Sequence, residues 1–169
     1  MRLTRLRLLA GLVALAGLLA GCVQGADPDL EGTTTTIIAV RHGDRNNSLE
    51  DRLNEKGRAR AQALAAALKG TRIDAIYIPD TQRNRETAAP LAAARGLEPR
   101  VVPTTNLAGT LLSGNAGKTV LWIGNKPNLS ALWTSLKAKD PPPLDYGDLF
   151  IVQVEGRTAT RVRRRHFGD

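Results

Sequence analysis

Apolar and polar positions along the chain form segments that predict strands and helices in alternation. Predominantly apolar runs of about four to eight residues predict buried strands at 37–40, 73–78 and 119–123. Apolar residues at helical spacing predict helices over 54–68, over 82–95 and after Pro127. A short strand is expected at 101–102. The pattern at 107–112 is compatible with a strand or a helix. Strands alternating with helices indicate a three-layer α/β fold, in which a mainly parallel sheet carries helices on both faces.

The last part of the chain follows a different pattern. A run of three prolines ends at Pro143 and interrupts regular structure there. Two further strands are expected after it, at 149–154 and 158–162, with a turn at Gly156.

The first 21 residues have the pattern of a secretion signal. Three arginines precede an apolar stretch over 8–19, which is shorter than the roughly 20 residues of a membrane-spanning helix. Residues 19–22, Leu-Ala-Gly-Cys, resemble the lipobox of bacterial lipoproteins, which implies lipidation of Cys22. The alternative is an ordinary secretory signal that contains a cysteine. Cys22 is the only cysteine, so an internal disulfide is excluded.

Three segments follow from this pattern: a lipoprotein signal peptide over 1–21, a flexible tether over 22–32 and one domain over 33–169. Removal of the signal lowers the formal net charge from +8 to +5, which favours anionic partners. Much of this charge lies at 161–165, where a solvated strand end is the alternative to a binding patch. Aromatic residues make up 4% of the chain, so nucleic acid is not expected as a partner.

Candidate chemistry begins where the first apolar strand ends, in the sequence Arg41-His42-Gly43-Asp44. Ligands of open α/β sheets bind outside the carboxyl ends of the strands. Arg41 can hold an anion there beside His42, while Gly43 lets a ligand approach the backbone. The alternative is a capped strand end with a solvated arginine.

Two more strand ends carry polar residues that belong to the same edge of a parallel sheet. The second strand leads to Arg83 and Arg85, and the third to Asn125 and Lys126. Arginines grip phosphoryl oxygens with paired hydrogen bonds, and a neutral imidazole is a competent nucleophile. The combination predicts a pocket for a phosphoryl group.

These residues occur in motifs that resemble those of the histidine phosphatase superfamily, also called phosphoglycerate mutase-like. Arg41-His42-Gly43 is similar to the Arg-His-Gly motif of that family. Residues 53–63 resemble its Leu-Thr-x-x-Gly-x-x-Gln-Ala helix start, and 76–88 resemble its segment with an arginine four positions before Thr-Ala. The resemblance implies that His42 takes the phosphoryl group, that Arg41 and Arg83 bind it, and that no cofactor takes part.

One departure from the family pattern falls after the third strand. Residues 120–132 are similar to the apolar strand and Gly-His-Ser-Asn-Thr-x-x-Ala-Leu segment of the family, and the second family histidine then falls on Asn125. An asparagine amide donates a hydrogen bond but carries no charge. Lys126 is a candidate for restoring that charge. The other histidine, His166, lies in the basic terminal segment and is expected to be exposed and structural.

A general acid must protonate an alkoxide leaving group, and Asp44 is the candidate nearest to His42. The alternative is that Asp44 forms an ion pair with Arg45 or Arg41. Glu86 is expected to pair with an arginine along its helix.

Two functions fit these observations. The first is a lipid-anchored cell-envelope phosphatase that hydrolyses a phosphomonoester through phosphorylated His42, with activity reduced by Asn125. The second is a non-catalytic protein that binds a phosphorylated ligand. A third, weaker possibility is a lipoprotein whose basic tail contacts anionic polymers. The expected partners are a small phosphorylated molecule and, through Cys22, a membrane facing the periplasm or the exterior. Two separated histidines and one lipidated cysteine predict no metal site.

Overall fold

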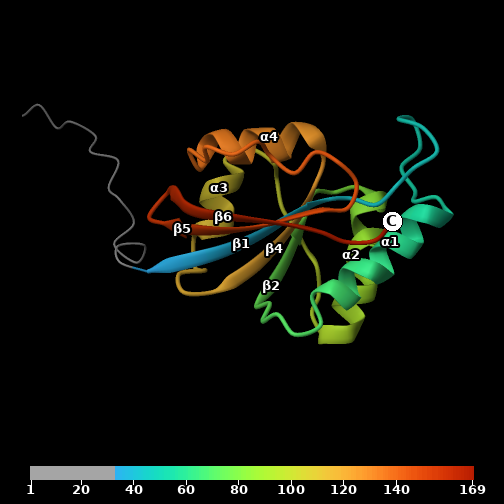
Figure 1. Ribbon diagram of the computed structural model, residues 1–169, viewed down its shortest axis with the longest axis horizontal. Helices are drawn as coiled ribbons and strands as arrows, with labels where there is room; N and C mark the ends of the chain where they lie inside the picture. Colours follow the sequence, from blue (N-terminus) through green and yellow to red (C-terminus); the bar gives the residue numbers. More distant parts are fainter. Residues whose placement is uncertain (1–32) are drawn as a thin grey trace, which may run out of the picture.

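The computed structural model describes residues 33–169, which form a six-stranded sheet with two helices on each face (Figure 1). The predicted signal peptide, Cys22 and the tether lie outside the described residues. Within 33–169, no helix is long and apolar enough to span a bilayer.

The strands lie in the order β3-β2-β4-β1-β5-β6. Neighbouring strands from β3 to β1 are parallel, whereas β5 pairs antiparallel with β1 and β6 pairs antiparallel with β5. The mainly parallel α/β sheet predicted from the sequence is thus confirmed, with an antiparallel hairpin added at one side. The elements are β1 (Thr34–Arg41), α1 (Glu55–Ala67), β2 (Ala75–Ile78), α2 (Gln82–Arg95), β3 (Arg100–Val101), α3 (Leu107–Leu112), β4 (Thr119–Gly124), α4 (Lys126–Ser135), β5 (Asp148–Glu155) and β6 (Thr158–His166).

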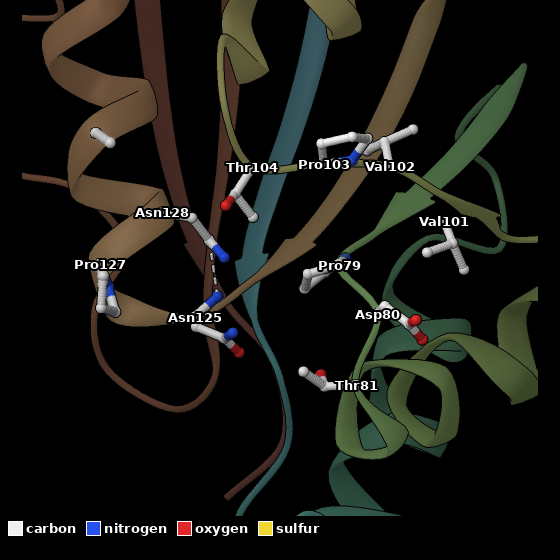
Figure 2. A pocket seen from close by; sticks show the side chains of 11 residues that line it. Pro79, Asp80, Thr81, Val101, Val102, Pro103, Thr104, Asn125, Pro127 and Asn128 are labelled. Atoms are coloured by element: carbon white, nitrogen blue, oxygen red, sulfur yellow. Dashed lines mark hydrogen bonds between the residues drawn. The ribbon is translucent and has the colours of Figure 1, made fainter.

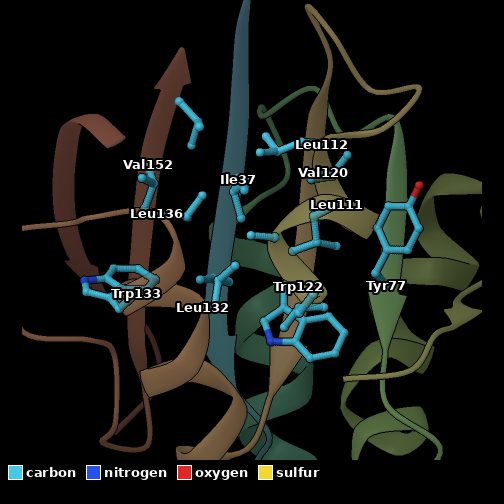
Figure 3. Close-up of a cluster of buried hydrophobic side chains, with 14 of the residues drawn as sticks. Ile37, Tyr77, Leu111, Leu112, Val120, Trp122, Leu132, Trp133, Leu136 and Val152 are labelled. Carbon is cyan, nitrogen blue, oxygen red and sulfur yellow. The ribbon is translucent and has the colours of Figure 1, made fainter. Parts of the chain in front are cut away.

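Each face of the sheet has its own apolar core because successive strand residues point to opposite faces. On the face covered by α3 and α4, Trp122 and Ile37 are fully buried against Leu111 and Leu132 (Figure 3). On the other face, Ile38 and Ile123 belong to the cluster that packs with α1 and α2. Burial on both sides explains why the central strands are uninterrupted apolar runs.

Two helix ends follow the predicted local chemistry. The Asn54 side chain accepts a hydrogen bond of 2.8 Å from the Gly57 N–H and caps α1. Gly96 follows α2 with a φ of 61°, a left-handed conformation that glycine adopts without steric cost.

Two boundaries differ from the sequence prediction for an evident physical reason, and one segment of undecided type is a helix. β2 begins only at Ala75, because the Asp74 carboxylate accepts the Thr119 N–H at 2.8 Å in place of a backbone carbonyl. Residues 107–112 form a helix, with Leu107, Ala108, Leu111 and Leu112 buried. β6 continues past 162 to His166, because its backbone still pairs with β5 while its arginine side chains are exposed.

Candidate active site

The loop after β1 is held between α1, α2 and β4. The His42 N–H donates to the Gly124 carbonyl at 3.0 Å, and the Gly43 N–H donates to Thr87 Oγ1 at 2.9 Å. A Cβ at Gly43 would lie 2.7 Å from the Gly57 carbonyl oxygen, and one at Gly57 would lie 2.2 Å from that of Asp44. This loop therefore packs directly on the first turn of α1, at a spacing that only two glycines permit.

His42 is buried at the end of β1, with 2% of its surface exposed. Its Nδ1 lies 2.7 Å from the Gly43 carbonyl oxygen, so a neutral ring donates its Nδ1–H there and keeps the lone pair on Nε2. Burial, assisted by the positive charges of Arg41, Arg83 and Arg45, lowers the pKa of His42 to about 4. The imidazole is therefore neutral at pH 7, the form that acts as a nucleophile.

Three guanidinium groups act on His42, and each has a buried Nε without a hydrogen-bond partner: Arg41, Arg45 and Arg83. Their outer nitrogens are held by other groups. Arg45 Nη1 donates to the Glu50 carbonyl at 2.6 Å, and Arg83 Nη1 pairs with Asp51. Unpaired buried donors are costly. Three guanidinium groups that act on one imidazole and each keep an unpaired donor suit an oxyanion such as a phosphoryl group.

Arg41 is oriented by the segment between α4 and β5. Its Nη1 donates to the Leu144 carbonyl at 3.1 Å, and its guanidinium lies 3.8 Å from the centre of the Tyr146 ring. The same ring meets His42 edge-on, with ring centres 5.8 Å apart. Tyr146 thus contacts both the predicted nucleophile and a predicted phosphate ligand.

Asn125 lies beside His42 because β4 pairs with β1 in parallel register up to Arg41 and Gly124. The Asn125 N–H donates to Asn128 Oδ1 at 2.8 Å at the start of α4. Its own Oδ1 is buried and has no hydrogen-bond partner. Lys126, the first residue of α4, is exposed.

Asp44 has a different partner from the two that the sequence suggested. Its carboxylate accepts Arg60 Nε at 2.6 Å, and Arg60 is 5% exposed. Arg60 also donates to the carbonyls of Phe167 and Asp169, and so joins α1 to the end of the chain. This buried ion pair supports a structural role for Asp44, while the general-acid role that the sequence suggested stays a prediction.

We expect Asp44→Asn to lower the free energy of unfolding by about 3 kcal/mol, because it leaves the buried Arg60 charge without its counter-ion. Urea unfolding measures this change. Asp80→Asn is the matched control: its carboxylate pairs with Arg85 at the surface, so we expect a change within about 0.5 kcal/mol. Unchanged stability of Asp44→Asn would contradict the structural role.

A cavity of about 760 Å³ lies along the same edge of the sheet, on the β2 and β3 side of Asn125 (Figure 2). Most of its wall is apolar or uncharged, and Asp80 is its single ionisable lining residue. Its lining residues are Pro79, Asp80, Thr81, Val101, Val102, Pro103, Thr104, Asn125, Pro127, Asn128 and Ala131. Asn125 lines this cavity directly after Gly124, which pairs with Arg41, so the cavity lies at the same strand ends as His42.

Comparison of the sequence with known protein families shows the family to which the chain belongs. The sequence profile of the histidine phosphatase superfamily (branch 1) matches residues 37–143, more than half of the chain. The chain belongs to this superfamily. The match contains most of β1, the other parallel strands and the four helices that residues 33–169 of this histidine phosphatase superfamily member form, and it ends before the β5–β6 hairpin. A comparison with curated protein sequences finds no match.

Solved structures share the fold. The protein histidine phosphatase SixA complexed with tungstate is 20% identical, with 78% of this chain and 96% of that chain covered at a TM-score of 0.64. YhfR from Bacillus stearothermophilus is 21% identical, with 74% and 94% covered at 0.63. Phosphoglycerate mutase from Bacillus anthracis is 13% identical, with 78% and 93% covered at 0.62. At these identities the likeness concerns the fold alone.

Sequence reasoning did not identify Arg45 or Tyr146 as site residues. Arg45 was assigned to a polar loop, although a third cation three positions after His42 was a usable signal. Tyr146 had no local signal, because it reaches His42 from more than 100 positions away, beyond the proline run.

The low pKa of His42 predicts a specific acid sensitivity. The unfolded chain binds a proton at His42 below about pH 6.5, whereas the folded protein does so only near pH 4. The unfolded state therefore binds more protons in this window, and stability falls as the pH is lowered through it. We expect this histidine to contribute a loss of about 3 kcal/mol between pH 7 and pH 4. Urea midpoints of wild type and His42→Gln at both pH values isolate the effect, and equal losses in the two proteins would contradict it.

Proposed function

We propose that this protein hydrolyses phosphorylated substrates through a phosphorylated His42. The observation that carries the proposal is a buried, neutral His42, whose Nδ1 is bound to the Gly43 carbonyl and whose pKa is lowered by the charges of three arginines, each with an unpaired buried Nε. Superfamily membership supports the same chemistry.

In the proposed reaction, Nε2 of His42 attacks phosphorus while the bond from phosphorus to the leaving group breaks. The leaving group departs with that electron pair, and Arg41, Arg45 and Arg83 offset the charge on the phosphoryl oxygens. Water then attacks phosphorus, the N–P bond breaks, and His42 and inorganic phosphate are released. The cavity beside Asn125 would take the leaving group.

The supply of a proton to the leaving group limits the range of substrates. The Asp44 carboxylate forms an ion pair with Arg60. Asp80 lines the cavity, and its carboxylate forms a surface ion pair with Arg85. We therefore expect the fastest reaction with substrates whose leaving group needs little protonation. Phosphohistidine belongs in the test panel for this reason, and because one structural neighbour is a protein histidine phosphatase.

A second candidate is non-catalytic binding of a phosphorylated ligand. Asn125 favours it, because this residue stands where the family resemblance places a second histidine and supplies no positive charge. The contacts of Arg41 with Leu144 and Tyr146 also compete with a bound phosphoryl group.

Two measurements on the full chain separate the candidates. Release of phosphate is followed with p-nitrophenyl phosphate, sugar phosphates and phosphohistidine, while calorimetry follows the binding of inorganic phosphate. Turnover together with binding supports the hydrolase, and binding without turnover supports the second candidate. If neither occurs, both proposals are wrong.

We also propose that the protein is anchored in the cell envelope by a lipid on Cys22. The arginines, apolar stretch and Leu-Ala-Gly-Cys sequence before residue 23 support this location. Incorporation of a labelled fatty acid in cells should be lost in Cys22→Ser. Equal labelling of the two proteins would contradict the anchor.

A further inference from the structure

Among the arginines of residues 33–169, only Arg161, Arg163 and Arg165 have side chains without a hydrogen bond, ion pair or ring contact. The others are engaged: Arg52 pairs with Glu86 and Arg72 with Asp74, for example, and Arg95 donates to backbone carbonyls. The three free arginines lie at alternate positions of one strand, β6, and all three are exposed. Their shared placement makes them a single feature, which we call the arginine row.

The arginine row lies on one face of the sheet edge. Alternate residues of a strand point to the same side, about 6.6 Å apart. Across the β5–β6 ladder, Arg161, Arg163 and Arg165 stand opposite Gln153, Ile151 and Leu149, none of which is acidic. Three positive charges thus lie in line, and no carboxylate stands directly opposite any of them.

Arg164, on the opposite face of β6, provides a contrast. It pairs with Asp140 at 2.9 Å, and its guanidinium lies 5.3 Å from the centre of the Phe150 ring. In the same strand, one arginine therefore makes contacts within the fold, whereas the three arginines of the row are exposed to solvent.

The position of β6 in the sheet adds a second observation. Within the sheet that residues 33–169 form, β6 is an outer strand, and no further strand of this sheet covers its free side. Its first residue, Thr158, pairs with Glu155, which in turn pairs with Thr34 at the start of β1 (Figure 1). The chain therefore enters the described domain, at Thr34, beside the β5–β6 turn from which the arginine row runs.

We propose that the arginine row binds the head groups of an anionic lipid surface. Its charge is complementary to such a surface, and each arginine near it adds to the attraction. The adjacent entry of the N-terminal segment favours a membrane over a polyanion in solution. Nucleic acid is less suited, since the residues opposite the row in β5 include no aromatic ring on which a base can stack. This inference is independent of the proposed phosphatase activity.

A vesicle competition with the full chain tests the proposal. The protein equilibrates between vesicles of phosphatidylcholine and vesicles that also contain phosphatidylglycerol, and the ratio of bound protein is measured. Apolar insertion contributes alike to both populations and cancels in the ratio. We expect wild type to prefer the anionic vesicles, and Arg161→Gln/Arg163→Gln/Arg165→Gln to lower that preference about 100-fold. Added salt should weaken the wild-type preference.

Two control variants separate the row from net charge and from damage to the strand. Arg52→Gln/Arg72→Gln/Arg85→Gln removes the same charge from other exposed positions and should keep the preference. Replacement of the row by three lysines preserves the charge and should also keep it. The proposal is overturned if wild type shows no preference, if the glutamine variant of the row retains it, or if either control loses it equally. Tighter binding to an oligothymidine than to anionic vesicles would also overturn it.

Discussion

Replacement of His42 by alanine is expected to reduce phosphate release to the uncatalysed background and to abolish a covalent phosphoenzyme. The reason is that Nε2 of His42 is the atom that forms the bond to phosphorus, and no neighbouring group can replace a neutral imidazole held by the Gly43 carbonyl. Removal of a nucleophile costs about 10⁶-fold in an efficient enzyme, so the measurable loss here is limited only by the wild-type rate.

Rapid acid-free quenching followed by mass spectrometry of the intact protein detects the phosphoenzyme as a mass increase in wild type. His166→Ala is the control, because His166 is exposed on β6 and should leave labelling unchanged. Binding of inorganic phosphate by His42→Ala should persist, since the three arginines remain. Equal turnover in wild type and His42→Ala would contradict the mechanism. A phosphoryl group found on His166 would show that His42 is not the nucleophile.

Asn125→His is expected to raise the rate of phosphoryl transfer by about 10²–10³-fold, the effect commonly measured for one charge-stabilising donor. A histidine there lies beside His42 in the sheet register and can carry the positive charge that an amide lacks. The replacement should fold, because the Asn125 side-chain oxygen makes no hydrogen bond and the backbone bond to Asn128 is independent of the side chain.

Single-turnover kinetics with p-nitrophenyl phosphate measures this gain. The double variant His42→Ala/Asn125→His should be inactive, which shows whether the gain passes through His42. A rise that persists without His42 would mean that the new histidine is itself the nucleophile. No gain, with phosphate binding intact, would mean that the missing charge at this position does not limit the rate.

The central elements of the fold could be predicted because local patterns determine them. The apolar strands 37–40 and 119–123 are buried on both faces and need no partner to be recognised. Asn54 and Gly96 mark helix ends through their own side chain or backbone freedom. By contrast, the length of β6 depends on pairing with β5, which its exposed arginines do not reveal.

For the candidate site too, some residues could be predicted from the sequence and others could not. Arg41, His42, Arg83 and Asn125 were predicted because each stands at a strand or helix end that a parallel sheet brings to one edge. Asp44 was assigned a chemical role from its nearness to His42 along the chain. Its actual partner, Arg60, lies on α1 and also holds the end of the chain.

The sequence by itself determined the α/β class and the superfamily motifs, and it predicted a phosphorylated ligand, because each of these depends on residues close together along the chain. Only the tertiary structure decided the environment of His42, which includes its burial, its low pKa, the charge of Arg45 and the contact with Tyr146. It also decided that Asp44 forms an ion pair with Arg60. Charge, desolvation and hydrogen bonding act over distances in space, and the fold alone sets those distances.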